Sequence, residues 1–502
     1  MRSKIAMGAS CRRSLVPSVA CGVLALVSAC AGTDVDGDQE LAPGSSTQAL
    51  GAKTLIAKGA ETAVSQVGSD GTLVVTANQD DLPPFMEFPP GSRIVRPGVT
   101  MLGYRRYNPT TNTILNQNIV INTANWSGLW GDPGIIRHRQ NSNQMYITNL
   151  GIPANKFPAS GQIVGSIAPT TLPANMCGAY LGGACIARST NSGALFTLAP
   201  ADCIRRVDAG CPFGHFYDGT DLETGTSGQV YAAFNDTNRS RIDMWMATSQ
   251  TGTFALVTDT SIVSSSHPRL RVSPGGVPYL AVTSGGNLML TRYNGGTTRT
   301  GTWSPAVTVA TGVTQAVVAL SDRSLRLGPQ YDLAIAPNEQ GVEEVRLAYT
   351  VLVNGQHKVR ISHCTTGATI TCANPSQWRT DNQAGKQWGP SITTGLRANG
   401  KRHWSVSFYS TATNPGSNLV DLWGGLAEKP GAAALILFKT ELAQVPCPDS
   451  RAGGGYWGDY DEMSVGGSGL VYRAFSDSSA GNCRRDTFTS SPLSSSISKW
   501  TI

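Results

Sequence analysis

Short apolar and β-branched runs, bounded by Gly, Asn, Asp and Pro, recur along the chain after residue 53. Clear examples are 72–76, 229–234, 278–282 and 470–475. Runs of this length and composition are typical of β-strands, while helical periodicity is scarce. Many short strands at regular spacing predict an all-β sandwich, barrel or propeller.

A weak internal repeat distinguishes among these architectures. Each unit opens with a polar or acidic residue beside Pro, Trp or Tyr and continues through strands separated by Gly/Asn turns. The units open at Glu61, Asp132, Asp221, His267, Asp332, Trp388 and Asp461. Because a small sheet cannot cover both of its own faces, such units stack around an axis until the ring closes. We therefore predict a single propeller of six or seven four-stranded blades over residues 54–490, followed by a Ser-rich tail or closing strand at 491–502.

The composition fits a folded soluble protein and argues against nucleic acid as a partner. Of 502 residues, 40% are hydrophobic and 14% charged, with a formal net charge of +6. Arg2, Lys4, Arg12 and Arg13 lie before residue 30 with no acid among them, so the remaining chain is close to neutral. It also contains no Lys/Arg block, which nucleic-acid binding favours.

The N-terminus has the pattern of an export signal. Residues 1–29 combine basic positions with an apolar stretch that starts at Leu15, which predicts a signal peptide. The run Val27-Ser28-Ala29-Cys30 resembles the lipobox of bacterial lipoproteins, which implies acylation of Cys30 and an outer-membrane or cell-surface location. Ordinary cleavage after Ala29, giving a periplasmic or secreted protein, is the alternative. Residues 30–53, polar and partly acidic, are predicted to be a tether.

Eight cysteines follow Cys30, and an even number in an exported chain predicts disulfides. Pairing nearest neighbours gives Cys177–Cys185, Cys203–Cys211, Cys364–Cys372 and Cys447–Cys483. The spacing of Cys and His residues contains no metal motif, so no transition-metal site is predicted. Ca²⁺ held by acidic side chains is the one cofactor left open.

One hairpin sequence carries a family resemblance. Residues Ser189–Phe196 resemble the Ser-x-Asp-x-Gly-x-Thr-Trp/Phe box of the sialidase-like (BNR/Asp-box) propeller superfamily, with Asn191 in the Asp place and Leu195 in the Thr place. Residues 248–254 form a shorter echo, and 455–461 resemble the final blade of exported members. The resemblance implies a propeller. Asp boxes lock hairpins and do not locate an active face, and the Phe/Tyr-Arg-Ile-Pro run that carries the first sialidase Arg is absent here, so no catalytic position is transferred.

In a propeller the innermost strands line a central channel, where the unit openings converge. We predict Asp132, Asp221, Arg269, Asp332 and Trp388 as ligand-binding residues there. Carboxylates, arginine and aromatic rings together suit a sugar. The alternative is that aspartates at these positions cap turns and accept backbone N–H groups between blades.

Arg269 and Arg271 lie two residues apart, so their side chains share one face of a strand. They are predicted either to hold an anionic ligand or to pair with acidic neighbours, and the sequence does not choose between these roles.

Two functions follow from this site. The first is binding of a glycan or a cell-surface protein without catalysis. The second is sialidase-like glycoside hydrolysis, for which Asp459, Tyr460, Asp461 and Glu462 are the candidate catalytic residues. Two carboxylates in different environments are able to serve as acid and as base or nucleophile, and a tyrosine beside them is an alternative nucleophile.

Overall fold

The computed structural model describes parts of the chain between residues 54 and 501. The described ranges are 54–58, 60–67, 71–78, 86–87, 92–94, 99–100, 102–122, 126–153, 164–165, 183–208, 211, 215–260, 262–264, 266–313, 316–319, 324–328, 330–338, 340–373, 378–380, 383–396, 400, 402–413, 415, 419–427, 436–439, 461–465, 470–477 and 494–501. The predicted signal peptide, Cys30 and the tether to residue 53 lie outside these ranges. Within them, no helix has the length and apolar character needed to cross a membrane.

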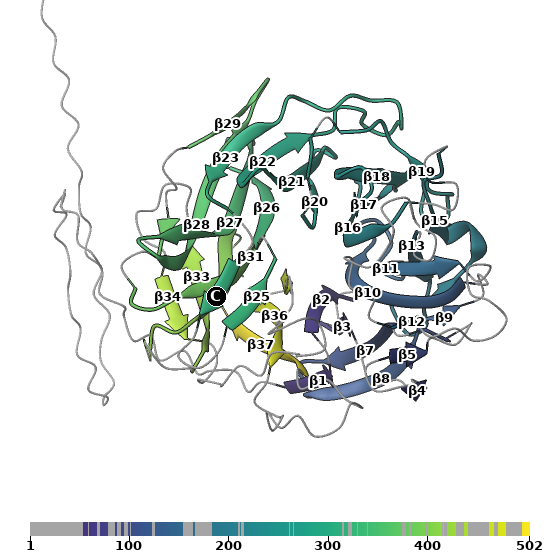
Figure 1. The fold of residues 1–502 in the computed structure, drawn as a ribbon, viewed down its shortest axis with the longest axis horizontal. Helices are drawn as coiled ribbons and strands as arrows, with labels where there is room; N and C mark the ends of the chain where they lie inside the picture. The colour runs from purple at the N-terminus through teal and green to yellow at the C-terminus, as the bar shows by residue number, and fades with distance from the viewer. Residues whose placement is uncertain are drawn as a thin grey trace, which may run out of the picture. The chain divides into compact units, whose positions relative to one another are not determined.

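Seven sheets in the described residues surround a central axis (Figure 1), and each contributes one inner strand. The inner strands are β2 (Ala60–Gln66), β10 (Trp126–Arg137), β16 (Tyr217–Thr224), β20 (Arg269–Val272), β26 (Tyr331–Pro337), β31 (Gln387–Leu396) and β35 (Met463–Val465). Each contacts the next in this order, and β35 contacts β2, so the ring is closed. The predicted single all-β propeller is confirmed, and every predicted unit opening lies in an inner strand or within two residues of one.

The other strands follow their inner strand outward, mostly antiparallel. The β2 sheet adds β3 (Leu73–Asn78), β7 (Leu102–Asn108) and β8 (Thr113–Ile119). The β10 sheet adds β6 (Val99–Thr100), β9 (Ile121–Asn122), β11 (Met145–Pro153), β13 (Ala184–Ser189), β14 (Thr197–Leu198) and β15 (Cys203–Ile204). The β16 sheet adds β17 (Val230–Asp236), β18 (Arg241–Ala247) and β19 (Ala255–Leu256).

The β20 sheet adds β21 (Pro278–Ser284), β22 (Asn287–Arg292) and β23 (Val307–Thr311). The β26 sheet adds β27 (Glu343–Val353), β28 (Gln356–Thr366), β29 (Ile370–Cys372) and β30 (Trp378–Arg379). The β31 sheet adds β32 (Arg402–Ser410), β33 (Asp421–Ala427) and β34 (Ile436–Lys439). Outside the seven sheets lie β4 (Met86–Glu87), β5 (Ser92–Ile94), β12 (Val164–Gly165), β24 (Ala316–Ala319), β25 (Ser324–Leu327) and a 3-10 turn, Pro200–Asp202.

The two ends of the described chain share one sheet. In the order β35, β36 (Leu470–Asp477), β37 (Ser494–Thr501) and β1 (Thr54–Lys58), the first strand of the propeller forms the outer edge of the last sheet. β1 pairs antiparallel with β37. Residues 494–501 are therefore a strand of this closing sheet, and the ring is joined by backbone hydrogen bonds between its beginning and its end.

Apolar side chains fill the space between each pair of neighbouring sheets. Tyr104, Met145 and Phe196, for example, pack between the β2 and β10 sheets, and all three are fully buried. Because successive side chains of a strand point to opposite faces, a sheet with neighbours on both sides needs apolar residues on both. Every residue of β17 is buried for this reason.

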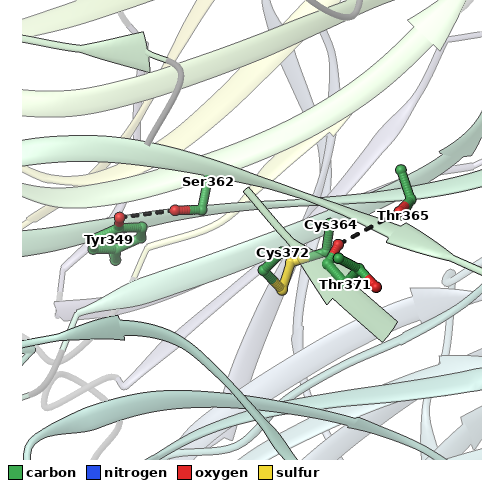
Figure 2. Close-up of a disulfide and its surroundings, with 6 residues drawn as sticks. All are labelled: Tyr349, Ser362, Cys364, Thr365, Thr371 and Cys372. Carbon is green, nitrogen blue, oxygen red and sulfur yellow. Dashed lines mark hydrogen bonds between the residues drawn. A yellow bond between two sulfur atoms is a disulfide. The ribbon is translucent and has the colours of Figure 1, made fainter. Parts of the chain in front are cut away.

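The disulfides correct part of the predicted pairing. Cys364–Cys372 is confirmed: the two residues face each other in the β28–β29 pair, with Cα atoms 3.9 Å apart (Figure 2). Cys185, however, bonds to Cys203, so the predicted Cys177–Cys185 and Cys203–Cys211 pairs are wrong. Antiparallel pairing of β13 with β15 places Cys185 directly opposite Cys203, and this register overrides sequence proximity.

Of the remaining cysteines, Cys211 is disulfide-bonded, while Cys177 and the predicted Cys447–Cys483 pair lie outside the described residues. Disulfides of this kind are typical of an extracellular or otherwise oxidising compartment.

The Asp-box-like hairpin has the hydrogen bonds expected of a lock. The Asn191 side-chain oxygen accepts the Leu195 N–H at 2.9 Å and the Ser189 hydroxyl at 2.8 Å. The Ser189 hydroxyl in turn accepts the Gly193 N–H at 3.0 Å. Gly193 has a φ of +72°, and a Cβ there would lie 2.5 Å from a valine side chain. Asn191 thus supplies the oxygen that an aspartate would, and the motif has a structural role.

Candidate functional site

A cavity of about 390 Å³ lies in the channel and is lined by residues of all seven inner strands, together with Arg139 after β10 and Glu462 before β35. Its polar lining includes Ser65, Arg139, Asp221, Glu223, Arg271 and Glu462. Among the described residues that line it, none is aromatic. A volume of this size is typical of small-molecule sites, and its ligand would be held by hydrogen bonds and charge.

Arg271 is fixed between two buried carboxylates. Its guanidinium donates to Asp221 Oδ2 at 2.9 Å and to Asp332 Oδ1 at 3.1 Å. Both aspartates are at most 3% exposed, and Asp221 Oδ1 also accepts its neighbour's N–H, from Leu222, at 2.8 Å. Burial lowers the pKa of Arg271, but the charges of the two aspartates outweigh it and raise that pKa overall. Arg271 is therefore cationic and immobilised.

The three aspartates predicted to bind a ligand all accept a backbone hydrogen bond. Each carboxylate accepts the N–H of a residue in the next blade. The pairs are Asp132 Oδ2 with Gly219 N at 2.7 Å, Asp221 Oδ2 with Leu270 N at 2.8 Å, and Asp332 Oδ2 with Ile392 N at 3.0 Å. These contacts connect neighbouring sheets at the channel. The sequence analysis gave this as the alternative role of these aspartates: to accept backbone N–H groups between blades. Of the three, only Asp221 also lines the cavity.

Glu462 and Arg269 form a second charged pair beside the first. Arg269 NH1 lies 3.6 Å from Glu462 Oε1, and both residues are almost fully buried. Burial raises the pKa of Glu462 to about 8; the charge of Asp221 adds to the rise, while Arg269 and Arg271 oppose it. Glu462 therefore carries a proton near neutral pH and borders the cavity. Arg269 and Arg271 both lie against acidic side chains, which is the second of the two roles predicted for them.

The other predicted residues lie elsewhere. Trp388 is fully buried and stacks on Tyr409, with ring centroids 5.8 Å apart, between the β31 sheet and the closing sheet. Asp461 accepts the Tyr409 hydroxyl and lies 3.7 Å from Arg473. Neither lines the cavity. Asp459 and Tyr460 lie outside the described residues.

Three charged residues at the cavity were not predicted: Arg137, Arg139 and Glu223. Arg139, one third exposed, donates to the Ser273 carbonyl at 3.0 Å and lies 3.7 Å from Glu223 Oε1. Glu223 follows Asp221 by two residues on the same strand, so strand alternation would have placed it on the same face. Arg139 follows the end of β10, where strand alternation no longer indicates the direction of a side chain.

Within the described part of the chain, two groups of side chains bring metal-binding atoms together. In the first, ligand atoms of Asp132, Asp218 and His267 all lie within 4.8 Å of one another. In the second, the same holds for Asp208, Cys211 and His215, but the Cys211 sulfur is in a disulfide. The second group therefore offers no thiolate to a metal.

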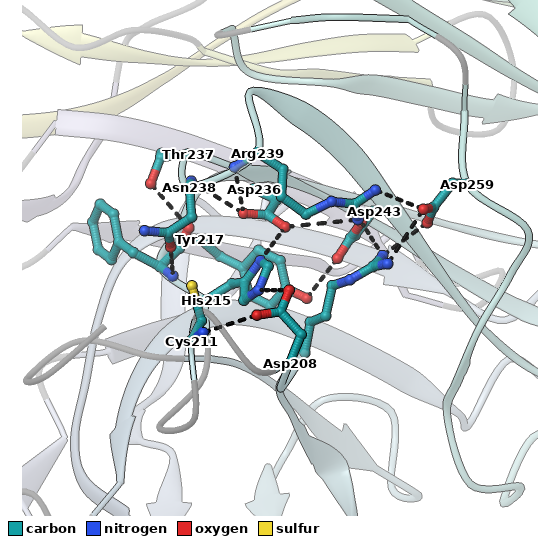
Figure 3. A network of polar contacts seen from close by, with 12 residues as sticks. Asp208, Cys211, His215, Tyr217, Asp236, Thr237, Asn238, Arg239, Asp243 and Asp259 are labelled. Atoms are coloured by element: carbon teal, nitrogen blue, oxygen red, sulfur yellow. Dashed lines mark hydrogen bonds and ion pairs between the residues drawn. The ribbon is translucent and has the colours of Figure 1, made fainter. Parts of the chain in front are cut away.

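The second group belongs to a network on the β16 sheet (Figure 3). His215 lies between two carboxylates, with Nδ1 2.6 Å from Asp236 Oδ2 and Nε2 2.9 Å from Asp208 Oδ2. Tyr217 donates to Asp243 Oδ2 at 2.9 Å. Burial raises the pKa of Asp243 to about 6, and nearby arginines oppose this rise. The network connects the segment before β16 to the β17–β18 turn and takes no part in lining the cavity.

The neighbouring arginines are Arg206 and Arg239, each 3.2 Å from Asp243 Oδ1. Both also reach Asp259, at 2.8 and 2.6 Å respectively.

Comparisons with known proteins find distant structural similarity. No protein-family model and no curated protein matches the sequence. Among solved structures, the Hadza microbial sialidase Hz136 is 12% identical, with a TM-score of 0.44, over 89% of this chain and 66% of that one. A protein of unknown function from Dyadobacter fermentans DSM 18053 is 11% identical, with a TM-score of 0.41, over 75% and 98%. The Penicillium chrysogenum alpha-L-arabinanase is 12% identical, with a TM-score of 0.39, over 74% and 92%. Similarities at this level assign no function.

Proposed function

We propose that this chain is an exported propeller that binds a glycan in its central channel. The observation that carries the proposal is the 390 Å³ cavity, whose lining combines hydroxyl, carboxylate and guanidinium groups. Hydroxyl-rich ligands need donors and acceptors of this kind in a concave site. Because the described lining contains no aromatic ring, hydrogen bonds and charge replace stacking in this site.

Arg139 provides the sharpest test. Its NH1 and NH2 atoms each donate to one backbone carbonyl, of Ser273 and Val272. A guanidinium has five N–H groups and this side chain is one third exposed, so N–H groups remain for a ligand, whereas Arg271 is held by two aspartates. Arg139→Ala should weaken binding of any glycan found in a broad panel by roughly tenfold or more, the worth of one charge-assisted hydrogen bond. Titration calorimetry measures the change.

A matched control is Arg299→Ala. Arg299 also donates to two backbone carbonyls, of Met246 and Thr253, but is not part of the cavity lining. Its replacement should leave glycan affinity unchanged. If no glycan in the panel binds, or if Arg139→Ala binds as tightly as the wild type, the proposal is wrong.

Glycoside hydrolysis is a second candidate, and Glu462 is the residue that favours it. A carboxyl group with a pKa of about 8 at a cavity wall holds the proton that a general acid donates. In this mechanism the predicted residues Asp459 and Tyr460 would supply the base or nucleophile, because Asp461 is bound to Tyr409 and does not line the cavity. Glu462→Gln should then lower turnover about 10²–10⁴-fold while glycan affinity persists. If the wild type cuts no glycan in the panel, hydrolysis is excluded for those substrates and binding remains.

We further propose that Cys30 is acylated and anchors the protein to a membrane. The support is the sequence Val27-Ser28-Ala29-Cys30 after an apolar stretch. The intact protein should enter the detergent phase on phase separation, and Cys30→Ala should release it to the aqueous phase. A wild-type protein that stays in the aqueous phase contradicts the anchor.

A further inference from the structure

Three side chains from neighbouring blades converge at one end of the channel. Asp132 lies in β10, Asp218 in β16, and His267 two residues before β20. Their carboxylate and imidazole atoms all lie within 4.8 Å of one another, and His267 Nε2 is 4.0 Å from Asp218 Oδ1. That separation exceeds a hydrogen bond, so the two groups face a common space without bonding directly across it.

In the described part of the chain, the basic side chain beside these two carboxylates is His267, and neither a lysine nor an arginine pairs with them. The buried carboxylates of Asp202, Asp221, Asp243 and Asp332 each face an arginine within 3.2 Å. Among the described residues, neither Asp132 nor Asp218 forms an ion pair with Lys or Arg. Asp132 is nevertheless only 7% exposed. Two carboxylates this close repel each other unless a proton or a cation lies between them. Among the described side chains, only His267, 4.0 Å from Asp218, could supply a positive charge here, without the close arginine that those four aspartates have.

The fold holds this arrangement in place. Asp132 Oδ2 accepts the Gly219 N–H at 2.7 Å, which fixes its orientation. Gly219 has a φ of +62°, and a Cβ there would lie 2.3 Å from the His267 ring. A glycine is therefore needed for the imidazole to lie against this part of the backbone. An outer hydrogen bond that orients a carboxylate is a common feature of metal sites.

We propose that Asp132, Asp218 and His267 bind a divalent transition-metal ion, Zn²⁺ or Mn²⁺. Imidazole favours zinc and the heavier transition metals, and carboxylates are accepted by zinc and manganese alike. Each Zn–O or Zn–N bond is about 2 Å, so shifts of less than about 1 Å bring all three atoms onto one ion. The Asp218 side chain is 46% exposed, which leaves the ion accessible from solvent.

The ion would lie close to the cavity but outside it. Each of the three residues precedes a cavity-lining residue of its own strand by three or four positions, about 10–13 Å along a strand. The site is independent of the proposed glycan binding, and either proposal is able to fail without the other.

The test is metal binding to the intact protein after removal of metals with a chelator. Titration calorimetry with Zn²⁺, Mn²⁺ and Ca²⁺ should show one transition-metal ion per chain, bound more tightly than Ca²⁺. Asp218→Asn and His267→Gln should each weaken binding at least tenfold, since even loss of an outer-shell partner costs about 10–100-fold. Asp132→Asn, which keeps an oxygen for the Gly219 N–H, should do the same.

Asp208→Asn is the matched control, because Asp208 also lies against a histidine, but the third ligand atom of its group, the Cys211 sulfur, is in a disulfide. It should bind metal like the wild type. Circular dichroism of the metal-free variants checks that they are folded. The proposal is overturned if no stoichiometric binding occurs, if His267→Gln binds as tightly as the wild type, or if Ca²⁺ binds as tightly as Zn²⁺ and Mn²⁺.

Discussion

Two buried groups of charged side chains, one in the channel and one around His215 on the β16 sheet, use the same residue types with different results. In the network of Figure 3, Asp243 faces Tyr217 at 2.9 Å and two arginines at 3.2 Å, and its pKa rises only to about 6. In the channel, Glu462 has its arginine at 3.6 Å, and its pKa rises to about 8.

The difference shows that hydrogen-bond donors and nearby cations determine the protonation state of a buried carboxyl group. Burial disfavours the charged form in both places, and hydrogen bonds or close cations oppose it. The network around His215 thus stabilises the β16 sheet through charged contacts, whereas the channel holds the protonated Glu462 carboxyl at the cavity. A carboxyl group with a raised pKa at a cavity, as in the channel, is the arrangement more typical of functional sites.

Removing a channel carboxylate should have the largest effect on stability. Asp332 accepts hydrogen bonds from Arg271, Ser391 and the Leu333 and Ile392 N–H groups. Asp332→Ala leaves these donors buried without it and should lower the free energy of unfolding by about 3–5 kcal/mol. Guanidinium titration measures the loss. A loss under about 1 kcal/mol would mean that the sheets do not depend on this contact.

The disulfide that precedes the network should come next. Cys185→Ser with Cys203→Ser opens a loop with a sequence separation of 18 and should cost about 3 kcal/mol. Hydrogen exchange should increase mainly in residues 203–220, which supply half of the network. The Cys364→Ser, Cys372→Ser pair, with a separation of 8, is the control and should cost somewhat less. Equal exchange gains in the channel strands would show that the two regions are not independent.

The pH dependence of stability should report on Glu462. The folded chain holds its proton more tightly than the unfolded chain, because the pKa rises from 4.5 to about 8. The stabilisation is therefore complete below pH 4.5 and is lost as the pH rises through about 8, by up to about 1.4 kcal/mol per pH unit. Glu462→Gln should remove this part of the slope. A slope between pH 5 and 8 that is identical in wild type and variant would contradict the raised pKa.

The smallest effect should come from the exposed edge of the network. Asp259 pairs with Arg206 and Arg239, but its side chain is 33% exposed. Asp259→Asn should cost no more than about 1 kcal/mol. The difference should shrink at high salt, since water and ions screen exposed pairs. A larger loss in the free energy of unfolding that does not depend on salt would mean that Asp259 behaves like the buried carboxylates of the network.

Strand pattern and unit openings were sufficient to predict the propeller. Each predicted opening lies in an inner strand or within two residues of one, and three of them, Asp132, Asp221 and Asp332, accept N–H groups from the next blade. Cys364–Cys372 was also predictable, since a short hairpin brings its two ends into register. These features depend on local periodicity and on contacts between segments that are adjacent in the chain, and both can be recognised from the sequence.

The site itself depended on contacts that the order of residues does not contain. Trp388 and Asp461 open their units like Asp221, yet they pack between sheets, because the direction of a side chain depends on the rotation of its strand. Arg139 reaches the cavity from beyond the end of its strand, and Cys185 meets Cys203 through a ladder between distant segments. Local sequence therefore determined the strands and the ring, while closure of the ring decided which side chains meet, because those contacts join residues far apart in the chain.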